Sequence, residues 1–214
     1  MKALCQITLV FIIVVTVWTF VYARTALDDF ESQRSAELTK QATKLARWAV
    51  ESRLHGDDTS KLPFKVHPLL KKRAGVFVTI TKDNNPRGCM GTIEPMQPNA
   101  AREIIASALG AAFSDSRRKP LEPRELTKVR FHVSIAGPMR PVAGMSDLAP
   151  ERLGLLVRNG SQAGILLPGE AKTASWQIRE CKRKAGIPAG MSVQMFVFRT
   201  VVLEEREKPG KRGF

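Results

Sequence analysis

A hairpin pattern near the middle of the chain constrains the fold most strongly. Gly75–Thr81 is rich in Val, Phe and Thr, as β-strands are, and Lys82–Pro86 has the composition of a turn. Arg87–Glu94 returns as a second strand, so the two segments are predicted to pair as a hairpin. Cys89 lies on the returning strand between two glycines. Because glycine weakens a strand, this pattern indicates a bulge or a close approach of backbone.

Helical and strand periodicities flank this hairpin. Ser35 is a good N-cap for a helix whose apolar stripe steps by three and four residues, and Asn99 is a good N-cap for a second helix. Val129–Ile135 alternates apolar and polar residues, as a half-buried strand does. The first stripe contains Leu38, Ala42, Leu45 and Ala49, and the second contains Ile104, Ile105, Ala108, Leu109, Ala112 and Phe113.

A similar unit follows in the last third of the chain. Pro138–Pro150 is rich in Pro, Gly and Met and is predicted to connect two lobes. Leu153–Arg158 and Ala163–Leu167 then flank an Asn-Gly turn, which predicts a second hairpin. A helix over Ala171–Ala185, ended by a glycine, and a last strand over Ser192–Leu203 complete the pattern.

These elements predict an α+β fold with two unequal lobes, each a small, mainly antiparallel sheet with packed helices, behind an N-terminal transmembrane segment. The predicted boundaries are 1–24 for a membrane anchor or signal peptide, 25–34 for a polar connector and 35–205 for the folded domain. Within the domain the larger lobe covers about residues 35–140 and the smaller about 150–203, and 206–214 form a charged tail.

The N-terminal segment is apolar over residues 3–23, without a charge between Lys2 and Arg24. This length is enough for a membrane helix and exceeds a typical signal-peptide core, which favours an uncleaved anchor. We therefore expect a single-pass membrane protein with its domain outside the cytoplasm. The alternative is a secreted or periplasmic protein, after cleavage of a signal peptide at Ala23.

Composition bounds the possible partners and cofactors. The formal net charge of +14 favours anionic small molecules or acidic proteins, although a well-solvated basic surface explains it equally well. Aromatic residues make up only 7% of the chain, which argues against nucleic-acid binding by base stacking. The sequence predicts no metal site, because its three histidines are scattered: His55, His67 and His132. It names no cofactor and no oligomeric state.

The strand after the first turn is the best candidate site. Arg87 is predicted to hold an anion or to favour the thiolate of Cys89. The glycines would let a ligand approach backbone N–H groups. The predicted ligand-binding residues are Arg87, Gly88, Cys89, Met90, Gly91, Thr92 and Glu94.

Three functions remain open from the residues alone. The first is a binding protein for a small anionic ligand or partner at this strand. The second is a cysteine-dependent enzyme with Cys89 as nucleophile and His132, the only histidine on a predicted strand, as base. The third is a non-enzymatic scaffold module. In every case Cys181 lies on the apolar stripe of its helix and is expected to be buried.

Several motifs, in order, resemble one family. Arg87–Thr92 reads Arg-Gly-Cys-Met-Gly-Thr and resembles the signature hexapeptide of the AMMECR1 domain family. The resemblance spans roughly residues 35–205 and includes Gly75–Ile80, Ala111–Phe113 with Asp115, Pro120–Leu121, Gly164–Pro168, Trp176, Cys181 and Lys184–Gly186.

The resemblance implies architecture better than activity, since the family has a fold but no settled reaction. Its members occur beside radical-SAM and Memo-type proteins, which implies partnership in a modification pathway. This chain departs from the family pattern in two places. Gly169 and Glu170 stand where a glutamine is usual, and Arg118–Lys119 replaces an aromatic residue and a proline.

Overall fold

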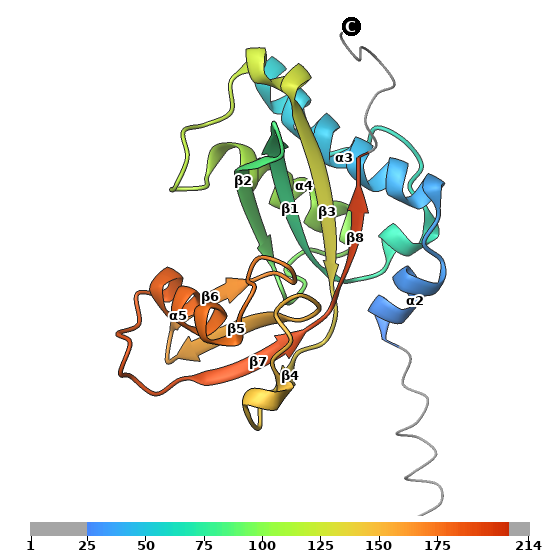
Figure 1. Ribbon diagram of the computed structural model, residues 1–214. Coiled ribbons are helices and arrows are strands. Elements are labelled where there is room, and N and C mark those ends of the chain that lie inside the picture. The colour runs from blue at the N-terminus through green and yellow to red at the C-terminus, as the bar shows by residue number, and fades with distance from the viewer. Residues whose placement is uncertain (1–24, 206–214) are drawn as a thin grey trace, which may run out of the picture.

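The computed structural model describes residues 25–205, which form two antiparallel four-stranded sheets with helices against them (Figure 1). The larger sheet has the order β2-β1-β3-β8, and the smaller has the order β4-β7-β5-β6. The strands are β1 (Gly75–Lys82), β2 (Asn85–Thr92), β3 (Val129–Ala136), β4 (Arg140–Pro141), β5 (Gly154–Asn159), β6 (Gln162–Leu166), β7 (Gln194–Phe198) and β8 (Thr200–Glu204).

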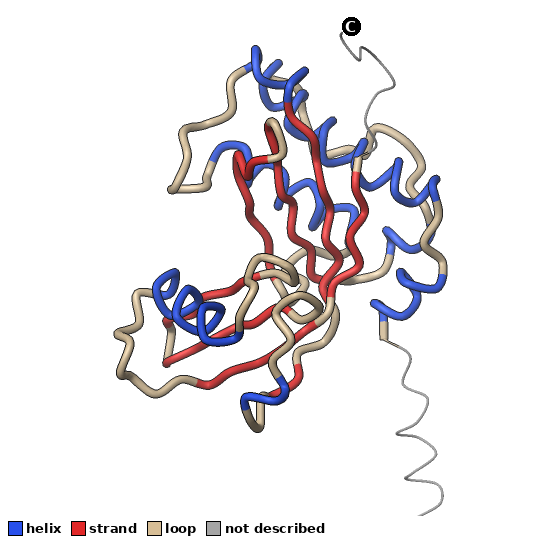
Figure 2. Tube along the Cα trace, viewed as in Figure 1, coloured by secondary structure: helices blue, strands red, loops and turns tan. Residues whose placement is uncertain are grey.

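Helices cover one face of each sheet (Figure 2). In the larger lobe, α3 and α4 pack on the face formed by alternate residues of β1 and β3. In the smaller lobe, α5 packs on β5 and β6. The helices are α2 (Ala26–Ser32), α3 (Ala36–His55), α4 (Ala100–Phe113) and α5 (Ala174–Ala185), with short 3-10 turns η1 (Pro68–Lys71), η2 (Pro123–Lys128) and η3 (Met145–Asp147).

The predicted antiparallel sheets, helices and turns are confirmed. Ser35 Oγ accepts from the N–H of Leu38 at 3.1 Å and so caps α3. Asp83 and Asn84 have φ of 50° and 61°, the two positive values that a type I′ turn needs between β1 and β2. Gly160 has a φ of 57° in the turn between β5 and β6. Local sequence therefore determines both hairpins.

The segment expected to be a polar connector forms α2 instead. Thr25 caps it and exchanges hydrogen bonds with Asp28, which makes a capping box. Leu27 and Phe30 point into the larger lobe's core, where Phe30 is 0% exposed. Apolar residues three positions apart behind a capping box explain why these residues fold as a helix rather than a linker.

The last predicted strand, Ser192–Leu203, is in fact two strands in different sheets. β7 pairs with β4 and β5, whereas β8 pairs with β3. The break falls at Arg199, whose carbonyl accepts from the N–H of Gly137 at 2.9 Å. The chain therefore crosses between the lobes twice, and the two crossing segments run side by side (Figure 1).

The transmembrane segment in the predicted fold class, and the membrane localisation drawn from it, require correction. Within residues 25–205 no helix is both long and apolar enough to cross a membrane. The 20-residue α3 has the length but contains charges such as Lys40 and Arg47. The stretch assigned to the membrane, residues 3–23, lies outside the described residues. The structure supports neither an anchor nor the alternative of secretion after cleavage at Ala23.

Candidate functional site

A cleft of about 440 Å³ lies between the two lobes. One wall is β2 with the loop after α4, and the other is β6 with the C-terminal half of α5. The residues that line it are Phe77, Cys89, Met90, Gly91, Ser114, Asp115, Ser116, Arg117, Ala163, Gly164, Ile165, Leu167, Glu170, Arg183 and Lys184. Three residues of the predicted site, Cys89, Met90 and Gly91, therefore line the same cleft as residues of the smaller lobe.

Strand alternation separates the predicted site residues into two groups. Gly88 and Thr92 face α4: a Cβ on Gly88 would lie against the carbonyl oxygen of Ala111. Thr92 Oγ1 donates to Glu103 Oε1 at 2.9 Å. Gly88 is therefore a packing glycine beneath a helix, and Met90 on the same face packs against Gly110 of α4 and also borders the cleft. Cys89 and Gly91 belong to the opposite face and line the cleft. Glu94 is exposed beyond the end of β2.

Asp115 and Arg117 hold the outer edge of β2 at Cys89. The N–H of Cys89 donates to Asp115 Oδ2 at 3.0 Å, and Arg117 Nη2 donates to the carbonyl of Cys89 at 3.4 Å. Arg117 Nε also donates to Asp115 Oδ1 at 2.8 Å. This bonding to Arg117 lowers the pKa of Asp115 to about 2, despite its burial. The pair satisfies backbone groups that a neighbouring strand would otherwise satisfy.

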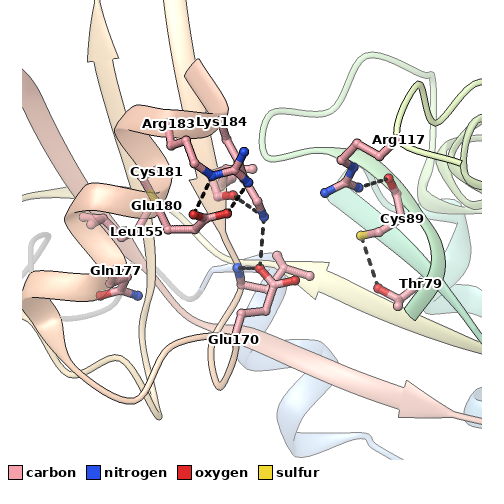
Figure 3. Close-up of polar contacts among 12 residues, drawn as sticks. Thr79, Cys89, Arg117, Leu155, Glu170, Gln177, Glu180, Cys181, Arg183 and Lys184 are labelled. Carbon is pink, nitrogen blue, oxygen red and sulfur yellow. Dashed lines mark hydrogen bonds and ion pairs between the residues drawn. The ribbon is translucent and has the colours of Figure 1, made fainter. Parts of the chain in front are cut away.

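The surroundings of the Cys89 thiol disfavour its thiolate form. Burial raises its pKa, and the hydrogen bond from Thr79 Oγ1 to its Sγ, at 3.2 Å, acts in the opposite direction with less effect. Glu170 on the other wall adds to the rise, whereas Arg117 and Lys184 oppose it. Figure 3 shows Thr79 and Arg117 on either side of Cys89.

Arg87 is engaged elsewhere. Its guanidinium makes two parallel hydrogen bonds with Glu125, at 2.9 and 2.8 Å, and donates to the carbonyls of Lys119 and Pro120. The pairing raises the pKa of Arg87 and lowers that of Glu125 to about 2. Arg87 therefore ties β2 to η2 and the loop before it, and the cations that act on the Cys89 thiol are Arg117 and Lys184.

His132 lies on the same exposed sheet face as Cys89 but has other partners. Its Nε2 is 2.9 Å from Thr81 Oγ1, and its Nδ1 is 4.0 Å from Glu204 Oε1. Burial lowers its pKa, so the ring is neutral near pH 7. Within residues 25–205 no group of three acidic, cysteine or histidine residues is placed to hold a metal ion.

The wall from the smaller lobe contributes charged side chains. Lys184 Nζ donates to the carbonyl of Ile165 at 3.3 Å and lies 3.7 Å from Glu170 Oε2. The same carboxylate oxygen accepts from the N–H of Leu167 at 2.8 Å. Arg183 pairs with Glu180 (Figure 3). Beneath this layer Cys181 is 0% exposed, as expected, and burial raises its pKa to about 12.

Sequence reasoning missed Arg117, Glu170, Arg183 and Lys184 as members of the site. The signal for Arg117 was its place in the basic loop after α4, two residues beyond Asp115. Glu170 was noticed only as a departure from a family pattern. None of these positions adjoins Cys89 in sequence. Arg117 reaches it from the loop after α4, and the other three reach the cleft because β6 and α5 fold back toward β2.

Comparisons with known proteins match most of the folded region. The AMMECR1 family model matches residues 43–203. A protein of Thermotoga maritima is 45% identical over 123 residues, which are 56% of this chain and 71% of that protein. A protein of Methanothermobacter thermautotrophicus is 36% identical over 155 residues, covering 68% of this chain and 80% of that protein. The crystal structure of an uncharacterized protein from Pyrococcus horikoshii superposes with a TM-score of 0.73 at 26% identity, over 83% of this chain and 96% of that one.

Proposed function

The chain belongs to the AMMECR1 family, and on that premise we propose that it is a binding protein whose interlobe cleft takes a small molecule with a carboxylate or phosphate group. The observation behind this proposal is the charge of the cleft. Three cations, Arg117, Arg183 and Lys184, line it beside the carboxylates of Asp115 and Glu170, and Arg183 is also paired with Glu180.

The cations come from both lobes, which favours a ligand that bridges them. Arg117 belongs to the loop after α4, and Lys184 to the last turn of α5. The Arg117 side chain is 53% exposed, so its outer face is open to a ligand even while it pairs with Asp115. A planar guanidinium and an ammonium on opposite walls suit a carboxylate or phosphate, whose oxygens accept several hydrogen bonds.

The raised pKa of the Cys89 thiol favours binding over nucleophilic catalysis, because the thiolate is the reactive form. A binding protein of this kind is compatible with a role beside the enzyme of a modification pathway, as the family resemblance implies. Its ligand would then be a reactant or product of that enzyme.

Thermal unfolding of the full-length chain in a panel of anions tests the proposal. The panel contains phosphate, citrate, glutamate and nucleoside monophosphates. An anion at 100 times its Kd stabilises the folded state by about 2.7 kcal/mol, which raises the Tm of a chain this size by roughly 5–10 °C. We expect Lys184→Met to abolish the shift. Arg179→Met, on the same helix but outside the cleft lining, is the matched control and should retain it.

A second basic hollow must be distinguished from the cleft. It measures about 430 Å³, lies at the Arg87 end of β2 and is lined by Lys82, Lys119 and Lys128 among others. An anion bound there would lose its effect in Lys119→Met and keep it in Lys184→Met. That result, or a panel without any stabilising anion, would overturn the proposal.

A further inference from the structure

The sheets have four edges, and three of them are covered or blunted. On β2, Asp115 and Arg117 occupy the outward groups of Cys89. β4 is only two residues long, and one of them is Pro141. β8 lies against α2, and Arg199 just before it forms ion pairs with Asp28 and Glu31. Native proteins protect sheet edges in such ways, because an open edge is a template for another strand.

The fourth edge, β6, lines the cleft and is covered at one end, where the side chains of Lys184 and Glu170 bond the outward groups of Ile165 and Leu167. It is the terminal strand of the smaller sheet and the one nearest the larger lobe (Figure 1). The carbonyl of Ile165 points away from β5, since it accepts from Lys184 Nζ. By the two-residue period of a strand, the N–H and C=O of Ala163 point the same way. Ala163 is exposed and has a small side chain, so its backbone is accessible from the cleft.

From this edge we propose that the ligand of the cleft is an extended peptide that adds a strand to β6 and places a carboxylate among Lys184, Arg183 and Arg117. The inference rests on the proposed function and names the class of its anionic ligand. Ala163–Leu167 spans about 13 Å at 3.3 Å per residue, which corresponds to a paired segment of four or five residues.

For the peptide to bind, its backbone must replace the hydrogen bonds that Lys184 and Glu170 now make to β6. The ammonium of Lys184 donates a hydrogen bond to the carbonyl of Ile165, and the carboxylate of Glu170 accepts one from the N–H of Leu167. Both side chains end long flexible stems and are 23% and 39% exposed, so they can leave the edge without unfolding it. A peptide N–H then replaces the ammonium at Ile165, and the released ammonium pairs with the peptide carboxylate. Backbone bonds give affinity, and the cations select for negative charge.

Selection of peptides that bind the full-length protein tests the inference. Two libraries of heptapeptides serve as probes, one with free C-termini and one with amidated C-termini, and the best binders are measured by titration calorimetry. We expect every enriched peptide to carry a carboxylate, whichever library it comes from. Enrichment only in the first identifies a C-terminal carboxylate, and enrichment in both identifies an Asp or Glu side chain. N-methylation at alternate residues should lower affinity at least tenfold, and methylation of the intervening residues should lower it far less, because only every second N–H faces β6.

A substitution in β6 provides the reciprocal test. Ala163→Pro removes the outward N–H and is tolerable because proline fits edge strands where that group faces outward. It should weaken the peptide at least tenfold, whereas Ala163→Ser keeps the backbone N–H and should leave the peptide affinity nearly unchanged. The methylation series decides the matter if the proline variant does not fold.

The outcomes separate the inference from the proposed function. Binding of small anions without enrichment of any peptide overturns the inference and leaves the function in place. Enriched peptides that are indifferent to N-methylation or to Ala163→Pro bind elsewhere, and they overturn it as well. When neither anions nor peptides bind, both proposals fall.

Discussion

Cys89 and His132 lie in one row across the exposed face of the larger sheet, with Thr79 between them. Thr79 is the register partner of Cys89 on one side and of His132 on the other. The backbones of Cys89 and His132 lie two strand spacings apart, about 9–10 Å, whereas a general base acts within about 3.2 Å of the atom whose proton it removes. In this structure the thiol bonds Thr79 and the imidazole bonds Thr81, so the two groups of the cysteine-enzyme hypothesis have separate partners.

The first prediction concerns the reactivity of the two described cysteines. A small alkylating reagent should label Cys89 faster than Cys181, because Cys181 is fully buried and its pKa is raised further. Thr79→Val should slow labelling of Cys89 roughly two- to tenfold, since it removes a hydrogen bond of about 0.5–1.5 kcal/mol that favours the thiolate. Mass spectrometry after timed quenching measures both rates.

The control for this prediction is Arg87→Ala, which should leave the labelling rate of Cys89 nearly unchanged. The sequence alone predicted the opposite, that Arg87 favours the thiolate. A slowing by Arg87→Ala as large as that by Thr79→Val would show that Arg87 acts on the thiol despite its pairing with Glu125.

Features determined over a few residues were predictable. The caps, the apolar stripes of α3 and α4 and the two hairpin turns each depend on residues within four positions of one another. The helix α2 was predictable in principle too, from the spacing of Leu27 and Phe30 behind Thr25. It was missed because its many polar residues resemble a linker.

Features that depend on distant packing were not predictable. The partner of Arg87 is Glu125, 38 residues away in a 3-10 turn. The break at Arg199 follows from the separation of the two sheets, not from the apolar run in which it lies. Lys184 reaches the cleft only because α5 packs on β6, and no spacing in the sequence specifies that approach.

The second prediction concerns acid stability and the Arg87–Glu125 pair. The pKa of Glu125 falls from an ordinary value of about 4.3 to about 2 in the folded state. A lowered carboxyl pKa stabilises the fold above the unfolded value, and this stabilisation is lost as the pH falls from about 4 toward about 2. Glu125→Gln should therefore lower the free energy of unfolding by about 1–3 kcal/mol near pH 6, and by less near pH 2.

Urea titrations at several pH values measure this difference. Glu151→Gln, which changes an exposed carboxylate, is the control and should alter stability by less than about 0.5 kcal/mol. If Glu125→Gln lowers the free energy of unfolding by the same amount down to pH 2, the charge of Glu125 is not what stabilises the link between β2 and η2.

The third prediction tests whether α2 is part of the fold or a linker. Phe30 is fully buried in the larger core, so Phe30→Ala should lower the free energy of unfolding by about 3–5 kcal/mol. Phe30→Leu keeps most of the buried volume and should lose markedly less. A linker residue would show no loss in either variant, and denaturant unfolding of the full-length chain distinguishes the cases.

The last prediction concerns the contact that builds the second wall of the cleft. A Cβ on Gly164 would lie against the carbonyl oxygen of Cys181, which is backbone of α5 and unable to move alone. Gly164→Ala should therefore push α5 off β6 and destabilise the protein by about 1–3 kcal/mol. Gly190→Ala is the matched control, because a Cβ there meets nothing within 4 Å and should leave stability nearly unchanged.

The same displacement of α5 moves Lys184 away from Ile165, since both lie where the helix crosses β6. Gly164→Ala should thus weaken anion binding in the cleft as well as stability, whereas Gly190→Ala should affect neither. Titration calorimetry with the stabilising anion, at a temperature where both variants remain folded, measures the binding. Full anion affinity in a destabilised Gly164→Ala protein would show that the position of α5 does not govern the cleft.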